Sequence, residues 1–509
     1  MNTFKRKALA TAVLGTLGVA AGSAHAIFQD PNGRGQALVY PYYTVNSDPN
    51  GNPFWTLLSV VNTTSEVKVV KVRFREGKAS AEVLDFNLYL SPNDMWTGAV
   101  IPASADASSP GHLVTADVSC TNPVIPASGV DFRNYQYTGS FDDPMANTLD
   151  RTREGYAEMF EMGVLPVGSP EADAATHDPG GAPSCAGLVG PNLTGSVGSA
   201  ITLPTGGLTG TGTLINVLSG RDTMYNANAF ADWSVITQYT DIGNDSPNFS
   251  ATTPANSTVT KTFVPQAGIT EVYFSSWDGF TSTAITVTAG AQAAAATMMH
   301  SDVINEYILD AATNSATDWV FTFPVKRLFV NAATAVTPFT NHLTADGACE
   351  TIDFQYFNRE EATAVGAGVD FSPTPPGAPS NSLCFESSVL SFRNGSASAP
   401  STPAAPSLVL GSQNVTAVTV NSDFQNGWGQ VHFSGANASS VGLVSGAASV
   451  TAIYPPFATG AGAQAFAGLP VVGFMARTYT NGLLQCSGAS CLGNYMGSVS
   501  HNYITTAAP

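Results

Sequence analysis

The chain has 509 residues, of which 44% are apolar and only 11% are charged. Acidic residues outnumber basic ones by 37 to 19, which gives a formal net charge of −18 at pH 7. A phosphate backbone would repel such a chain, so we expect no nucleic acid partner. Plentiful aromatic residues favour a folded core over disorder, and the scarcity of charge implies that Ser, Thr, Asn, Gln and Gly face much of the solvent.

Residues 1–26 have the features of a secretory signal peptide. Basic residues within Met1–Lys7 precede an apolar run over Ala8–Ala21, and Ala24–Ala26 has the small-x-small form that signal peptidase recognises. We therefore expect a secreted protein at the cell surface or outside the cell, with the periplasm as the alternative. No later stretch reaches about 18 uninterrupted apolar residues, so we expect no integral membrane segment.

The stretch Trp55–Ile101 predicts a β-meander around which the rest of the fold is organised. Apolar and basic residues alternate over Val70–Arg75, and apolar and polar residues alternate over Leu84–Leu90, a period of two that a helix cannot present to one core. Each run should have one dry face and one wet face. Turn-prone residues at Asn62–Ser65 and Glu76–Lys78 separate the runs.

The middle of the chain alternates between strands and loops. Arg151–Leu165 has helical propensity, but its apolar residues alternate and glycines bound it, so we predict a strand. Pro166–Gly190 is rich in Pro, Gly and Ala and predicts an exposed insertion. The glycine-rich stretch Gly195–Gly220 resembles a phosphate loop but lacks the Lys-Ser/Thr ending, and a glycine-punctuated strand is favoured instead.

In the C-terminal part, Ala289–Asp310 is the best predicted helix, because Ala293–Ala296 favours helix and the apolar residues after it follow a helical spacing. Thr317–Pro324 predicts an aromatic strand. A final series of strands includes Leu469–Tyr479, and the following Asn-Gly pair at 481–482 is typical of a hairpin turn.

Together these patterns predict a mainly β protein, an antiparallel β-sandwich of the immunoglobulin-like or jelly-roll-like kind with long loop insertions and one or two short helices. We expect N-terminal sandwich strands over 27–165, a loop-rich insertion with strands over 166–268, and a β-rich part over 269–509. Because the last strands resemble the first meander, we expect the two ends of the chain to share one sandwich.

Six cysteines in an exported chain indicate three disulfides, and six cysteines allow 15 pairings. We favour pairing between sequence neighbours, namely Cys120 with Cys185, Cys349 with Cys384, and Cys486 with Cys491. A cysteine-based metal site is the less favoured alternative, because no CxxC motif occurs.

No established catalytic motif is present, so we predict no enzyme and no catalytic residue. Glu154, Glu158 and Glu161 lie close in sequence and could form a carboxylate site, but a solvated face is the favoured interpretation.

No cofactor is expected apart from calcium, for which two loops carry weak candidate ligands. Oxygen-bearing side chains recur in each loop, as hard cations require, although such turns more often satisfy their own backbone. The candidates are Asp48, Asn50, Asn52, Asp241, Asn244 and Asp245.

Several blocks of the chain resemble a group of uncharacterised, exported proteobacterial surface proteins. The blocks are GRGQALVYPYYTVN, TLLSVVNTT, ATDWVFTFPVKR, VVGFMARTYTNG and GNYMGSVSHNY, which cover about a quarter of the chain. The resemblance implies a secreted β-rich protein and carries no activity or site residue with it.

Three functions remain open from the sequence. The leading hypothesis is a non-enzymatic structural protein of the cell surface or extracellular space, an S-layer-like or fibre-forming subunit that self-associates through sheet edges and neutral polar faces. The second is an adhesin that binds cell-envelope polysaccharide or another surface through exposed Trp55, Trp96, Trp277 or Trp428, although most tryptophans are core residues. The third is a secreted hydrolase with an unrecognised carboxylate site.

Overall fold

The structure is a computed structural model, and strands account for 46% of it against 10% for helices, which confirms the mainly β class. It describes residues 27–508 except 139–142, 179–180, 252–257, 266–279, 288–289, 363–370, 373–381, 395–405, 421–423, 434–450, 453–464, 467, 487–488 and 506. The predicted signal peptide and the predicted strand at 269–277 lie outside these described residues.

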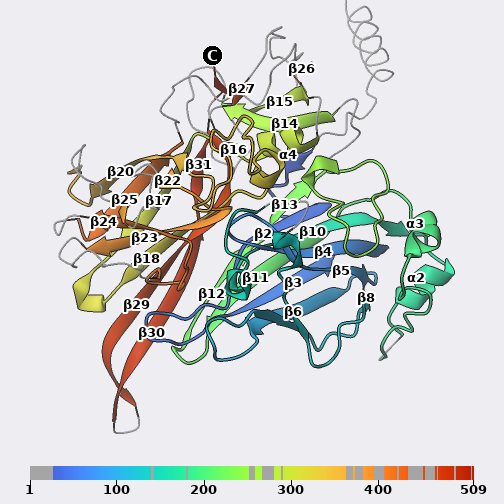
Figure 1. Cartoon of the computed structure of the whole chain (residues 1–509), viewed down its shortest axis with the longest axis horizontal. Helices are drawn as coiled ribbons and strands as arrows, with labels where there is room; N and C mark the ends of the chain where they lie inside the picture. The colour runs from blue at the N-terminus through green and yellow to red at the C-terminus, as the bar shows by residue number, and fades with distance from the viewer. Residues whose placement is uncertain are drawn as a thin grey trace, which may run out of the picture.

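The first half of the chain folds into two antiparallel sheets that pack face to face, the N-terminal sandwich (Figure 1). Its first sheet has seven strands, in the spatial order β1 (Phe28–Gln29), β13 (Asn228–Ala231), β2 (Ala37–Thr44), β10 (Glu154–Leu165), β4 (Val67–Glu76), β5 (Glu82–Leu90) and β8 (Cys120–Asn122). Its second sheet has six, in the order β12 (Arg221–Asn226), β11 (Leu208–Asn216), β3 (Trp55–Asn62), β6 (Met95–Pro102), β7 (Gly111–Val114) and β9 (Val130–Asp131).

Alternation along the strands fills the space between these sheets. Val70, Val72 and Phe74 point from β4 into the core, where they meet inward residues of the second sheet such as Leu58 and Trp96. This confirms the dry face that the sequence predicts. The strand predicted from the alternation in Arg151–Leu165 is also confirmed, since it is β10, the central strand of the first sheet.

The second half of the chain builds its own pair of sheets, the C-terminal sandwich. One sheet has the order β20 (Asp353–Asn358), β25 (Asn426–His432), β17 (Asp302–Ile308) and β31 (Asn502–Ile504). The other has the order β21 (Phe371–Ser372), β24 (Val415–Val420), β23 (Ser387–Asn394), β18 (Ala316–Thr322), β29 (Val472–Cys486) and β30 (Ala489–Ser500). The two sheets meet through aromatic rings, for example Trp319 against Phe354, with centroids 6.0 Å apart.

Small elements complete the fold. A three-stranded sheet holds β14 (Thr258–Pro265), β15 (Phe280–Val287) and β26 (Thr451–Ala452), and three strand pairs join β16 (Met299–His300) to β28 (Leu469–Pro470), β19 (Glu350–Thr351) to β22 (Ser382–Leu383) and β27 (Ala465–Phe466) to β32 (Ala507–Ala508). The α-helices are α2 (Pro170–Ala175), α3 (Val197–Ala200) and α4 (Gly290–Thr297). The 3-10 turns are η1 (Tyr135–Tyr137), η2 (Leu149–Arg153), η3 (Leu193–Gly195), η4 (Phe249–Ala251), η5 (Ala311–Thr313) and η6 (Lys326–Leu328).

The helix predicted over Ala289–Asp310 is wrong beyond Thr297. Only the alanine-rich start is helical, as α4, and the rest forms β16 and β17. Val303 and Tyr307 fit a helical spacing, but with Asn305 they also fit a period of two, and all three are buried. Pairing of β17 with β25 and β31 decides in favour of the strand.

The expectation that both ends of the chain share one sandwich is replaced by two sandwiches in contact. Each main sheet takes strands from one half only, and the strands β11, β12 and β13, from the region expected to be an insertion, complete the N-terminal sandwich. The two halves join where both faces of β18 are buried. Trp319 and Phe321 belong to the core of the C-terminal sandwich, whereas Val320 packs with the N-terminal core.

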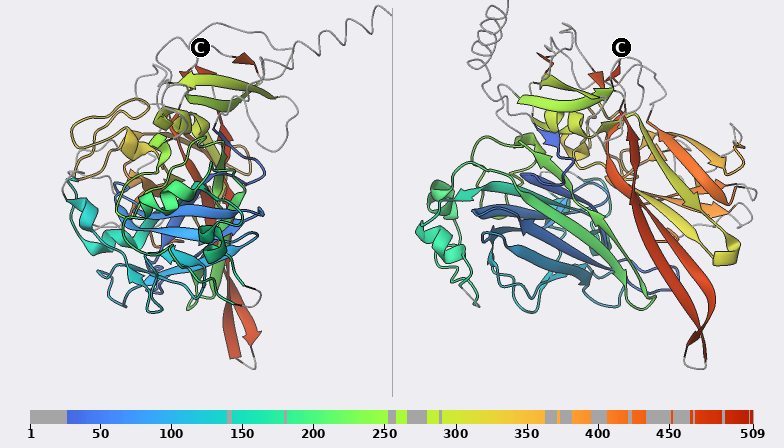
Figure 2. Two further views of the ribbon diagram at one scale, coloured as in Figure 1. Left: turned by 90° about the vertical axis from the view of Figure 1, so that its right-hand side faces the viewer. Right: turned by 180° about the vertical axis from the view of Figure 1, so that it is seen from behind.

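A long hairpin extends past the body of the molecule. Strands β29 and β30, of 15 and 12 residues, pair from Phe474↔Ser500 to Cys486↔Ala489. Figure 2 shows their far end standing clear of both sandwiches. A hairpin is therefore confirmed, but its predicted turn at 481–482 is wrong. Both residues lie within β29, where the register shifts between Asn481 and Leu483, and the strand continues to Cys486.

Candidate interaction site

The outer face of the six-stranded sheet is exposed, and we call its central part the open sheet face. It is formed by outward-pointing residues of β3, β6 and β11 and of the β7 region, namely Leu57, Ser59, Met95, Thr97, Ala99, Val114, Thr115, Thr211 and Thr213. The register sets them in rows across the sheet, since Leu57 lies opposite both Ala99 and Thr213. A hollow of about 500 Å³ lies over them.

The sequence Thr209-Gly-Thr-Gly-Thr213 explains how this face arises. In a strand, successive residues point to opposite sides, so the threonines face outward and the glycines face the core. A Cβ at Gly210 would collide with the Tyr40 hydroxyl, and one at Gly212 with the Tyr225 ring. Glycine here makes room for core tyrosines, which supports the strand interpretation over a phosphate loop.

The open sheet face is neutral and partly apolar. Leu57 is 37% exposed and Met95 is 49% exposed, and every residue that lines the hollow is uncharged. Charged groups stand at the border, where Asp117 accepts a hydrogen bond from the Thr97 amide. The whole chain has a net charge of −18, whereas this face carries no charge, and exposed faces with contiguous apolar residues mark interaction sites.

The basic side chains that alternate along β4 do not form the wet face that the sequence predicts. Lys71, Arg73 and Arg75 are completely buried, because the loop that follows β13 covers them. Each pairs with a carboxylate: Lys71 with Asp85 at 3.1 Å, Arg73 with Glu82 at 2.6 Å and Arg75 with Glu158 at 2.6 Å. A charged side chain is tolerated in a protein interior when an opposite charge pairs with it in this way.

These cations also hold the covering loop. Lys71 donates to the Asp241 carbonyl, and Arg73 donates to the carbonyls of Asn244 and Pro247. The predicted calcium ligands of this loop thus lie together around a hollow of about 750 Å³, with their backbone anchored from beneath.

The carboxylates of this loop are engaged by protein donors. The Asp241 carboxylate accepts hydrogen bonds from the Leu193 amide and the Thr194 hydroxyl. Asp245 pairs with Arg75 at 3.0 Å and with Arg327 at 2.6 Å. Burial alone would raise the pKa of Asp245, but these guanidinium groups outweigh it and hold the pKa below its ordinary value.

The other predicted calcium loop forms a turn around Asp48, which is buried. One oxygen of its carboxylate accepts hydrogen bonds from the amides of Asn50 and Asn52, and the other accepts one from the Ser219 hydroxyl. The Asn52 side chain itself donates to Ser219. These hydrogen bonds are those of an Asx turn, in which an Asp side chain binds the backbone of its own loop. Within the described residues, no group of three or more His, Cys, Asp or Glu side chains could hold a metal ion.

The three glutamates around β10 are buried, which corrects the expectation of a solvated face. Glu158 pairs with Arg75, and Glu161 pairs with Lys68 at 2.9 Å. Burial raises the pKa of Glu154 and of Glu161. The structure thus commits these carboxylates to hydrogen bonds and ion pairs within the fold. The signal that sequence reasoning missed was the set of four basic residues on β4, the strand that pairs with β10.

Two of the four tryptophans proposed for surface binding are accessible. Trp55 is 41% exposed and Trp428 is 39% exposed. Trp96 is completely buried against Phe86, so it cannot stack on an external ligand. Trp277 lies outside the residues that the structure describes.

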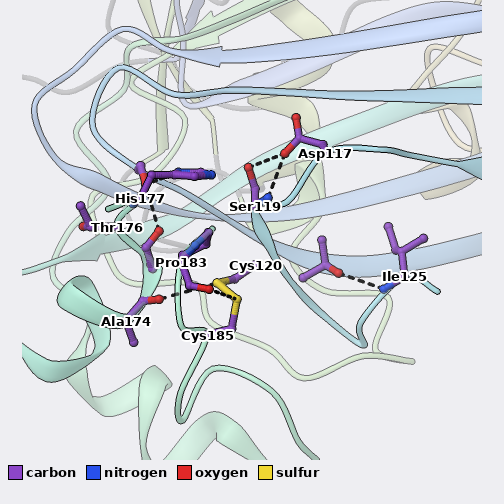
Figure 3. Close-up of a disulfide and its surroundings, with 12 residues drawn as sticks. Asp117, Ser119, Cys120, Ile125, Ala174, Thr176, His177, Pro183 and Cys185 are labelled. Atoms are coloured by element: carbon purple, nitrogen blue, oxygen red, sulfur yellow. Dashed lines mark hydrogen bonds between the residues drawn. A yellow bond between two sulfur atoms is a disulfide. The ribbon is translucent and has the colours of Figure 1, made fainter. Parts of the chain in front are cut away.

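Two predicted disulfides are present. Cys120 of β8 bonds to Cys185, with Cα atoms 5.5 Å apart, and ties the α2 segment to the first sheet (Figure 3). The Cys185 amide also donates to the Ala174 carbonyl at 2.9 Å. Cys349 bonds to Cys384. The side chains of Cys486 and Cys491 lie outside the described part, so their pairing stays a prediction.

Comparisons with protein-family models, with curated proteins and with solved structures find no match for this chain. None of the helices in the described ranges has the length and apolar character needed to cross a bilayer.

Proposed function

We propose that the protein is a non-enzymatic, secreted structural protein of the cell surface or extracellular space, and that its copies associate through the open sheet face. The observation that carries this proposal is the contrast between a net charge of −18 and an exposed, uncharged sheet face. Two copies repel each other over most of their surfaces, and this repulsion is weakest where neutral faces meet.

The composition of the face supports contact between sheets. Leu57 and Met95 offer apolar area, while the threonine rows offer hydroxyl groups that both donate and accept hydrogen bonds. Cross-strand hydroxyl contacts already occur there, as between Ser59 and Thr211 at 2.9 Å. The far end of the edge strand β30 offers a second route, because sheet edges can pair with another chain. Nearer the body, Asn494 and Ser498 of this strand already donate hydrogen bonds to Ser219 and Met224.

The test is a concentration series of the mature protein in light scattering and sedimentation. We expect association in the wild-type protein and at least about a tenfold weaker association for Leu57→Glu or Thr213→Glu, because each places a carboxylate in the contact. Val336→Glu is the matched control, since Val336 is 56% exposed in the other half of the chain.

A wild-type protein that stays monomeric at every concentration and appears as single particles in electron microscopy would overturn the proposal. An equal loss of association in the Val336→Glu control would also contradict it, because the effect would then come from added charge in general.

A further inference from the structure

A groove lies where the segment 406–414 of the C-terminal half meets the N-terminal sandwich. One hollow of about 350 Å³ is lined from the C-terminal side by Pro406, Gln413 and Asn414. A second hollow of about 400 Å³ shares Ser47 and Arg153 with the first, so the two adjoin. We infer that this groove binds a neutral oligosaccharide, a function distinct from the proposed self-association.

Arg153 gives the groove a fixed floor. Its guanidinium donates to the Asn46 side-chain oxygen at 3.2 Å, to the Val45 carbonyl at 2.7 Å and to the Ser109 carbonyl at 3.1 Å. Arg153 is only 5% exposed. Because these hydrogen bonds already fix the Arg153 side chain, ligand binding costs no conformational entropy at this residue, which favours affinity.

The charges in the first hollow balance. Its lining includes the cations Lys78, Arg151 and Arg153 and the anions Asp48, Asp150 and Glu154. Three positive and three negative groups leave no net charge, in a chain where acids outnumber bases about two to one. The lining therefore suits a ligand that is polar but uncharged.

Two buried amides beside this hollow have unused hydrogen-bonding capacity. Asn414 is 2% exposed, and neither atom of its side-chain amide has a hydrogen-bond partner. Asn46 is 5% exposed, and its amide nitrogen has none. Unpaired buried polar atoms cost free energy. These atoms have almost no exposed surface, so both side chains must turn toward the hollow before sugar hydroxyls, which donate and accept, pair with them.

The second hollow supplies an apolar platform. Trp55 is 41% exposed there, and Pro53, Ile101 and Pro102 lie around it. An indole ring offers a large flat surface against which the C–H face of a sugar ring can pack. An aromatic platform beside a polar, uncharged hollow is the combination that an oligosaccharide requires, with orientation fixed by a few polar groups.

The test is isothermal titration calorimetry of the full mature protein with neutral hexasaccharides of glucose, mannose and N-acetylglucosamine, and with an anionic hexamer of galacturonate. We expect at least one neutral sugar to bind more tightly than the anionic one. Trp55→Ala should weaken that binding at least about tenfold. Gln413→Ala, at the other end of the groove, should weaken it by a smaller factor.

Trp428→Ala is the matched control, because Trp428 is 39% exposed on β25 of the C-terminal sandwich and stacks on Phe357. It should leave the affinity unchanged. Absence of binding to every neutral hexamer, tighter binding of the anionic one, or equal losses in the two tryptophan variants would overturn the inference. Titrating at protein concentrations below those at which light scattering detects association keeps the result separate from self-association.

Discussion

The carboxylate of Glu154, on β10 of the N-terminal sandwich, accepts a hydrogen bond of 2.6 Å from the hydroxyl of Ser412 in the C-terminal half. The backbone amides of Gln413 and Asn414 also donate to Glu154, and the Tyr42 hydroxyl donates from β2. One buried side chain thus joins the two halves of the molecule.

Glu154→Ala should therefore destabilise the protein strongly. It would leave the donors of Tyr42, Ser412 and Gln413 without a partner in a buried site, a loss of roughly 2–4 kcal/mol in the free energy of unfolding. Urea denaturation measures this. Glu306→Ala is the control, because the Glu306 side chain is 70% exposed. Equal midpoints for the two variants would contradict the joining role of Glu154.

The buried cations of β4 predict an asymmetry between ion pairs. Arg75→Met leaves Glu158 buried without its partner, so we expect a loss of about 3–5 kcal/mol in thermal or chemical unfolding. Arg477→Met removes a solvent-exposed pair with Glu306 and should cost less than about 1 kcal/mol. Similar losses of unfolding free energy in both variants would show that burial does not determine the cost of breaking these ion pairs.

Stability should fall as the pH rises through the titration range of Glu386. Burial raises the pKa of this carboxyl to about 7 from an ordinary 4.5, so the folded protein keeps its proton where the unfolded chain has lost it. The unfolded state then binds fewer protons between pH 4.5 and 7, and stability decreases across that window, by the order of 2–3 kcal/mol.

Glu386→Gln removes this titration, so unfolding measured at a series of pH values should show a flatter profile for the variant between pH 4.5 and 7. A profile parallel to that of the wild-type protein would place the titration elsewhere, for example at His432, whose pKa a hydrogen bond to Asp302 raises.

The disulfides can be tested separately from the fold. Cys120→Ser with Cys185→Ser opens a link that spans 65 residues and should lower the free energy of unfolding by about 2–5 kcal/mol. Mass spectrometry of unreduced proteolytic peptides should also find Cys486 joined to Cys491. Free thiols at these two positions would refute the predicted third bond.

Calcium should have little effect on thermal stability. The oxygens of Asp48 and Asp245 already accept hydrogen bonds from the protein, so a cation would have to displace those donors. Melting temperatures with calcium and with a chelator should agree. A clear rise with calcium would show that a site forms despite these bonds, because a ligand that binds the folded state stabilises it.

Local alternation was enough to predict the strands and part of the core. Val70, Val72 and Phe74 face the interior as their spacing indicates, and β10 was predicted from the same period. Helical propensity failed at Val303 and Tyr307, where both periods fit and the distant strand β25 decides. Such pairing has no local signature in the sequence.

The burial of Lys71, Arg73 and Arg75 could not be predicted, because the loop that covers them lies more than 150 residues away in the chain. The open sheet face was partly visible in the alternation of Thr and Gly before β11 ends at Asn216. The exposure of this face could not be predicted from the sequence, because alternation does not show which of the two faces of a sheet packs on the core. The part of the groove lined by Pro406, Gln413 and Asn414 forms only where the two halves of the chain meet.

The projecting hairpin affects how the molecule moves in solution. Val472–Thr478 of β29 pair with β18, and the rest of the strand, up to Cys486, extends beyond that pairing. This projecting part is roughly 25 Å long, so the hairpin adds hydrodynamic drag out of proportion to its mass. The protein should therefore diffuse and sediment more slowly than a sphere of equal mass, and its tumbling should be anisotropic. A size read from elution volume alone would overstate its molecular weight.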